Sequence, residues 1–68
     1  MIKLTRTNDV VFYLNSNEIE RMELIPETAL ILLNGKTYIV KESIDEVIRR
    51  IIEFNRKIHY QYKKSVEN

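Results

Sequence analysis

His59, the only histidine among the 68 residues, is the side chain best suited to exchange a proton near neutral pH. A general base also needs a positioned partner, and no serine, cysteine or aspartate stands close to His59 in the sequence. Near the end of a predicted helix, histidine more often interacts with the helix dipole or with solvent. We therefore predict that the chain is not an enzyme and has no catalytic residue.

Metal ligands are also few, because the chain has no cysteine and its carboxylates do not follow the spacing of a calcium loop. We predict no metal site and no cofactor. A domain of this size buries only about 60% of its unfolded surface, so it often needs additional support. Without a disulfide or a metal, we expect a partner subunit to provide that support.

Polar side chains around the first predicted hairpin could form a small recognition surface from Arg6, Asn8 and Asn15. Turn chemistry is the simpler explanation of the two asparagines, because an asparagine side chain hydrogen-bonds to its own main chain in turns. Glu27 follows Pro26, which ends a predicted strand, and it is either presented to a partner or part of the turn.

Apolar residues off the predicted core are candidates for self-association. Phe54 and Tyr60 lie off the main apolar stripe of the predicted helix, and Tyr13 lies on the second face of a predicted strand. A domain this small cannot hide every apolar side chain, and an exposed apolar patch often marks an interface. We predict a homo-oligomer. The candidate interaction surface comprises Arg6, Asn8, Tyr13, Asn15, Glu27 and Phe54.

Nucleic acid and a membrane surface are the alternatives to a protein partner. Aromatic and basic residues could bind single-stranded nucleic acid by base stacking and phosphate contacts. They are Tyr13, Tyr38, Tyr60, Tyr62, Lys63 and Lys64. Acidic residues also lie on the strands, and the net charge is only +1, so we do not expect nucleic-acid binding. Acidic residues on the polar face of the helix favour packing on the sheet over lying on a membrane, and no run of ~18 apolar residues predicts a membrane span or a signal peptide.

The elements that must position these residues follow from local patterns. Ile2 and Leu4 alternate with polar neighbours, which is typical of a half-buried strand. We predict an α+β fold of about five short, mainly antiparallel strands in a meander or a partly closed small barrel, followed by one C-terminal amphipathic helix. The strands span about residues 2–6, 10–15, 19–25, 29–33 and 36–41, with Ile19 facing opposite Met22 in the third. The fourth is continuously apolar and is predicted to be central and buried on both faces.

Turn residues separate the predicted strands. Asn8-Asp9 is predicted as a two-residue hairpin turn, and Asn34-Gly35 as a type I′ turn in which both residues have positive φ. Ser43 and Glu46 form a predicted capping box, with the Glu46 side chain returning to the Ser43 amide.

The predicted helix spans about residues 44–63, in a single domain of residues 1–64 with a frayed tail at 65–68. Its charged face holds four pairs of oppositely charged residues spaced i, i+4, which support the helix. Its apolar stripe comprises Ile44, Val47, Ile48, Ile51, Ile52, Asn55, Ile58 and Tyr62.

Six short segments occur in the order and spacing of the FlbD-like (SwrD) family of flagellar and swarming motility proteins. They are Leu4–Asn8, Phe12–Asn15, Ile19-Glu20, Pro26–Thr28, Asn34–Lys36 and Val40–Ser43. Over about residues 1–58 the chain resembles this family, and the ordered set is more specific than any one segment. The chain differs in three places: Asp9 stands where the family usually has glycine, Glu27 where aspartate is commoner, and the tail is longer.

The resemblance implies a non-enzymatic accessory role in flagellar motility. It implies support of swarming and of motor power through the stator units, with flagellar motor or stator proteins as partners. The implied location is cytoplasmic, at the inner face of the membrane where the protein would meet the motor. A small nucleic-acid-binding regulator of motility genes is the alternative.

Overall fold

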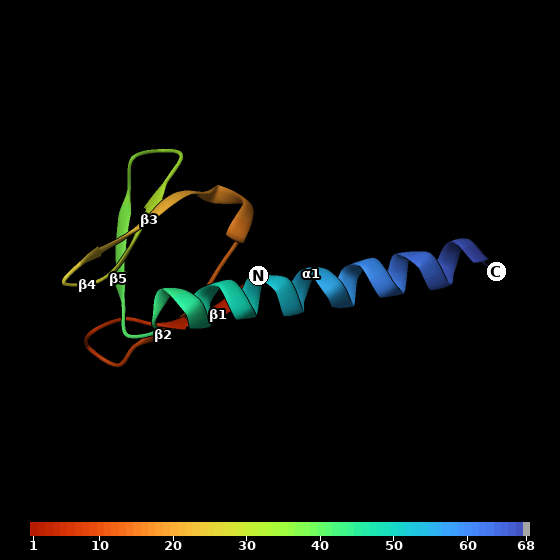
Figure 1. Cartoon of the computed structure of the whole chain (residues 1–68), viewed down its shortest axis with the longest axis horizontal. Coiled ribbons are helices and arrows are strands. Elements are labelled where there is room, and N and C mark those ends of the chain that lie inside the picture. Colours follow the sequence, from red (N-terminus) through yellow and green to blue (C-terminus); the bar gives the residue numbers. More distant parts are fainter. Residues whose placement is uncertain (68) are drawn as a thin grey trace.

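The computed structural model describes the backbone of residues 1–67 and the side chains of residues 1–58. Five strands precede one long helix (Figure 1). The strands are β1 (Ile2–Thr5), β2 (Val11–Leu14), β3 (Ile19–Ile25), β4 (Glu27–Leu32) and β5 (Thr37–Val40). A 3-10 helix, η1 (Ser16–Glu18), joins β2 to β3, and α1 (Ile44–Glu67) follows β5. The α+β class, with mainly antiparallel strands and a C-terminal helix, is confirmed.

The strands form two small antiparallel sheets. One contains β1 and β2, and the other has the order β3-β4-β5. The sheets meet where Arg6 forms an isolated antiparallel bridge with Val40 and the Lys41 amide donates to the Thr5 carbonyl at 2.9 Å. No strand pairing joins β2 to β3 within residues 1–67, so the two sheets do not close into a barrel.

The loop between β1 and β2 is one residue longer than the predicted two-residue turn. The Arg6 amide donates to the Val10 carbonyl at 2.9 Å, and the Asp9 amide donates to the Arg6 carbonyl at 2.9 Å. Residues 7–9 therefore form a three-residue loop, and only Asp9 has a positive φ, of 70°. A type I turn followed by a left-handed residue gives this geometry, and aspartate tolerates the left-handed region better than most side chains.

The loop between β4 and β5 repeats this pattern. Leu32 donates to the Lys36 carbonyl at 2.8 Å, and Gly35 donates to the Leu32 carbonyl at 3.0 Å. Gly35 has a φ of 88°, whereas Asn34 does not have a positive φ. The predicted type I′ turn was therefore wrong, because the loop takes in one more residue and needs only one left-handed position.

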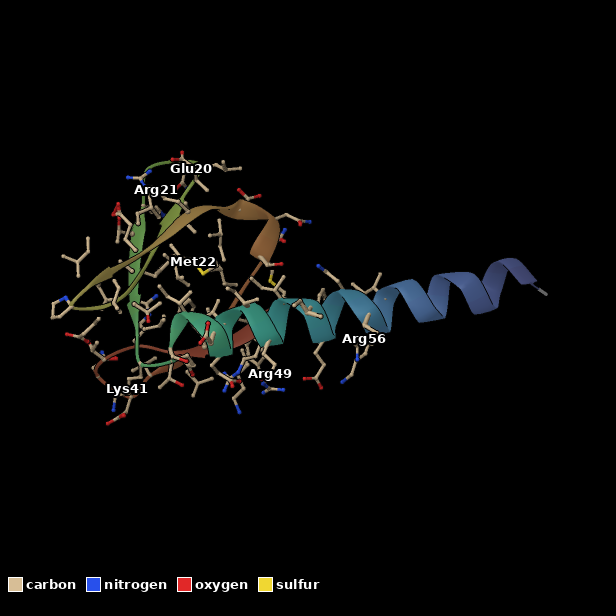
Figure 2. The ribbon with its side chains drawn as sticks, in the orientation of Figure 1. Glu20, Arg21, Met22, Lys41, Arg49 and Arg56 are labelled. Carbon is tan, nitrogen blue, oxygen red and sulfur yellow. The ribbon has the colours of Figure 1, made fainter. Side chains whose placement is uncertain are left out.

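A bulge in β3 changes which side chains face the core. The pairing of β3 with β4 shifts register between Ile19 and Arg21. Ile19 and Met22 both pack against the core, although strict alternation predicted them on opposite faces. A bulge inserts one unpaired residue and so reverses the alternation beyond it. Figure 2 shows Met22 pointing between the β3–β5 sheet and α1.

The core lies between the two sheets and the first half of α1. Adjacent residues Ala29 and Leu30 in β4 are both buried, whereas Ile31 is only partly buried. The buried cluster consists of Ile2, Leu4, Leu14, Leu30, Leu32, Val40 and Val47.

The start of α1 is capped by Ser43, whose hydroxyl accepts from the Glu46 amide at 3.1 Å. The reciprocal half of the predicted capping box is absent among the described contacts. The Glu46 carboxylate instead accepts from Arg49 at 2.6 Å and from Arg50 at 2.7 Å. Hydrogen bonds between charged groups are stronger than those to a neutral amide, which explains the exchange of partner.

The helix contacts the core through a narrower stripe than predicted. Val47 is buried, and Ile51 and Phe54 pack beside it. Spacing of i, i+4 and i+7 places these three residues on one line, so Phe54 lies on the core stripe and not off it. Ile52 is about half exposed because it lies off this line of residues. Ile58 is also half exposed, at a point where α1 extends past the strands (Figure 1).

The helix continues to Glu67, beyond the predicted end at residue 63 and through most of the tail expected to fray. Neither glycine nor proline follows Ile44, so the sequence contains no residue that would break the helix.

Candidate interaction surface

A groove separates the outer face of the β1–β2 hairpin from one side of α1. Residues that alternate with the buried Ile2 and Leu4 point outward along β1, and their partners on β2 do the same. The groove has a volume of about 460 Å³. Its lining residues are Met1, Ile2, Lys3, Thr5, Val11, Glu42, Arg50, Glu53, Phe54 and Lys57.

Glu42 connects the segments that form the groove. Its carboxylate accepts from the Thr5 amide at 2.9 Å and from the Thr5 hydroxyl at 2.9 Å. Arg50 donates to the same carboxylate at 3.1 Å and to the Lys3 carbonyl at 2.6 Å. Only 9% of the Glu42 side chain is exposed. These contacts fix α1 against β1 and hold the walls of the groove in place.

The pKa values of two carboxyl groups reflect this network. Burial alone would raise the pKa of Glu42. Hydrogen bonds from the Thr5 amide, from the Glu42 main chain and from the Thr5 hydroxyl outweigh this effect, and together with the charge of Arg50 they lower the pKa below its usual value. Hydrogen bonds from Arg49 and then Arg50 lower the pKa of Glu46 to about 2. Both carboxylates are therefore ionised at neutral pH.

Apolar side chains are exposed along the hairpin side of the groove. Val11 lines the groove and is 47% exposed, and Tyr13 next along the same face of β2 is 64% exposed. Lys3 pairs with Tyr13 across the hairpin, and Phe54 lines the groove from α1. Of the predicted site residues, Phe54 lines the groove and Tyr13 lies beside it, opposite Lys3.

Arg6 and Asn8 lie elsewhere, near the contact between the two sheets. The Arg6 guanidinium lies over the rings of Phe12 and Tyr38, at 5.0 Å and 5.1 Å from their centroids. Asn8 accepts from the Val10 amide at 3.2 Å, as turn chemistry predicted. Both residues line a second hollow of about 260 Å³ beside β5.

Asn15 and Glu27 are separated from both hollows. The Asn15 side chain caps η1 by accepting from the Asn17 amide at 3.0 Å. Glu27 is exposed beside Pro26, at the junction of β3 and β4. The six predicted residues therefore do not form one surface. Lys3, Val11, Arg50 and Lys57 were missed as site residues, because nothing in the local pattern places them beside one another.

The side chains of His59, Tyr60, Tyr62, Lys63 and Lys64 lie outside the described residues. Within the described part of the chain, no group of three or more histidine, aspartate or glutamate side chains could hold a metal ion. The described helix is not apolar enough along its length to cross a membrane.

Comparison with known proteins identifies the family of the chain. The sequence model of the FlbD family, described as flagellar and swarming motility proteins, matches residues 1–59. Neither a curated protein nor a solved structure matches the chain.

Proposed function

Because the chain belongs to the FlbD family of flagellar and swarming motility proteins, we propose that it is a non-enzymatic interaction module that supports the power of the flagellar motor. Its partners are then motor or stator proteins, and it acts in the cytoplasm at the inner face of the membrane. The groove between the hairpin and α1 is the proposed contact surface.

The exposure of Val11 and Tyr13 beside this groove carries the proposal. Apolar side chains on an outer strand face lose water when a partner covers them, and this favours association. The groove walls are fixed by the contacts of Glu42 and Arg50, so a partner meets a surface that is already ordered. A preformed surface loses less conformational entropy on binding.

The test has a genetic part and a chemical part. A deletion strain should swarm poorly and show reduced torque per motor, and expression of the intact chain should restore both. Normal torque in the deletion strain would contradict a role in motor power.

Site-specific cross-linking tests the contact surface in motile cells. A benzophenone amino acid placed at Val11 or Tyr13 should capture a motor or stator protein, whereas the same group at Glu27 should not. Glu27 is the matched control, because it is exposed but does not line the groove. Capture from Glu27 alone would refute the proposed surface, and capture of RNA alone would favour the nucleic-acid regulator.

Self-association is a separate prediction. Sedimentation at tens of micromolar protein should show a species larger than the monomer. A monomer throughout that range would contradict the predicted homo-oligomer.

A further inference from the structure

We infer that the groove between the β1–β2 hairpin and α1 binds an acidic segment of another protein. Apolar side chains of that segment enter the groove, and carboxylates of the same segment lie on either side of them. This inference rests on the proposed interaction role and adds the chemistry of the partner. Its basis is the charge that remains on the groove after the internal ion pairs of the protein are made.

The carboxylates of the groove are already engaged. Glu42 forms an ion pair with Arg50 at 3.1 Å, and Glu53 forms one with Arg49 at 2.8 Å. Each of these glutamates therefore has a positive neighbour that offsets its charge, and neither offers a strong site for an incoming cation.

The lysines of the groove are in a different situation. Lys3 and Lys57 line it from β1 and from α1, and both side chains are exposed. Among residues 1–58, neither forms an ion pair. Two cations thus border the groove from opposite elements, and they are complementary to carboxylates on a partner.

The space between the lysines suits apolar side chains. Val11 and Phe54 line the groove from its two walls, and the buried Ile2 contributes to its base. Its volume, about 460 Å³, lies in the range of ~300–1,000 Å³ that is common for ligand pockets. That volume accommodates a few anchoring side chains from a segment, with the carboxylates of that segment at the rim.

A second copy that docks through the Ile52 side of α1 fits the groove less well. The exposed apolar residue Ile52 on α1 is accompanied by Arg49 and Arg56, and Figure 2 shows both arginines on the side of α1 opposite the β3–β5 sheet. Arg49 is already paired with Glu53, whereas Arg56 has no ion pair among residues 1–58. Docking of this side of α1 into the groove of another copy would bring Arg56 toward Lys3 and Lys57, and these positive charges would repel each other. An acidic partner removes that repulsion.

The experiment selects ligands without assuming their sequence. Random 16-residue peptides displayed on phage are selected on the full chain, and the best peptide is then measured by fluorescence anisotropy. We expect the selected peptides to combine net negative charge with two or more apolar residues. Enrichment of basic or uncharged peptides, or no enrichment, would overturn the inference.

Charge reversal locates the binding site. The variant Lys3→Glu/Lys57→Glu should raise the dissociation constant of the best peptide about tenfold, because two attractions become repulsions. The control Lys36→Glu/Arg56→Glu makes the same change in net charge at exposed residues that do not line the groove, and it should change the constant by less than about twofold. Equal effects of the two variants would place the binding elsewhere and refute the inference.

The remaining outcomes separate this inference from the proposed function. If sedimentation shows dimers that the selected peptide dissociates, the groove binds a second copy and the acidic partner is wrong. If peptide binding behaves as expected but deletion leaves torque unchanged, the proposed role in motor power fails while the groove chemistry stands. If torque falls but no acidic peptide is selected, only the partner chemistry is lost.

Discussion

Replacing Glu42 with alanine should destabilise the protein more than any other single change at an acidic residue of the groove. Glu42 is nearly buried and accepts two hydrogen bonds from Thr5 and one from Arg50. The substitution removes all three and leaves the Thr5 amide and hydroxyl in a part-buried place without this acceptor. It also removes the group that connects β1 to the start of α1.

The expected loss is about 3 kcal/mol. A hydrogen bond to a charged group contributes about 1.5–3 kcal/mol, and contributions within one network do not add fully. A domain of this length has a total unfolding free energy of roughly 3–10 kcal/mol, so the loss is a large fraction of it. The midpoint of thermal unfolding should fall by about 12–24 °C.

Thermal and urea unfolding followed by circular dichroism at pH 7 measure this loss. Glu53→Ala is the matched control, because Glu53 lines the same groove and forms an exposed ion pair with Arg49. It should cost no more than about 1 kcal/mol. Glu42→Gln should lie between the two, since its amide oxygen can still accept from Thr5. Equal losses for Glu42→Ala and Glu53→Ala would refute the view that Glu42 fixes the helix to the hairpin.

Three further predictions concern stability. Folding lowers the pKa values of Glu42 and Glu46, that of Glu46 to about 2. The two carboxylates therefore stabilise the folded state fully above the unfolded pKa of about 4.5, and this stabilisation is lost as the pH falls toward 2. Urea unfolding from pH 6 to pH 2 should show this loss, and the slope should be shallower in Glu42→Ala. Gly35→Ala should cost about 1 kcal/mol in urea unfolding, because φ is 88° there and a Cβ meets nothing within 4 Å, so backbone strain is the only penalty. An unchanged urea midpoint for Gly35→Ala would show that this loop adjusts its backbone and avoids the strain. Leu30→Ala should cost about 2–5 kcal/mol by thermal unfolding, since Leu30 is 0% exposed. Leu24→Ala should cost far less, because Leu24 on the neighbouring strand is 68% exposed. Similar losses for the two variants would contradict the placement of Leu30 in the core.

Much of the fold follows from signals that reach only a few residues along the chain. Alternation in residues 2–5 identifies the buried face of β1, and the continuously apolar run before Asn34 identifies the central strand. The Ser43 cap is likewise local, because its hydroxyl accepts from an amide three residues later. Such patterns survive because their physical cause lies within the segment itself.

Predictions failed where the decision lay between two conformations of similar local energy. Asn34-Gly35 is compatible with a two-residue or a three-residue loop, and the register of β4 with β5 selects the longer one. The bulge beside Ile19 depends in the same way on pairing with β4. Phe54 was placed off the core stripe because the sequence does not say which line along an apolar helix meets the sheet.

The sequence alone determined the class of the fold, the order of its strands and helix, and the resemblance to a motility family that comparison then supported. Only the tertiary structure decided the groove. Glu42 is 37 residues from Thr5, and Arg50 is 47 residues from Lys3, yet each pair is hydrogen-bonded. No local pattern encodes contacts over such separations, because they form only when the sheet and the helix pack together and bring β1 beside α1.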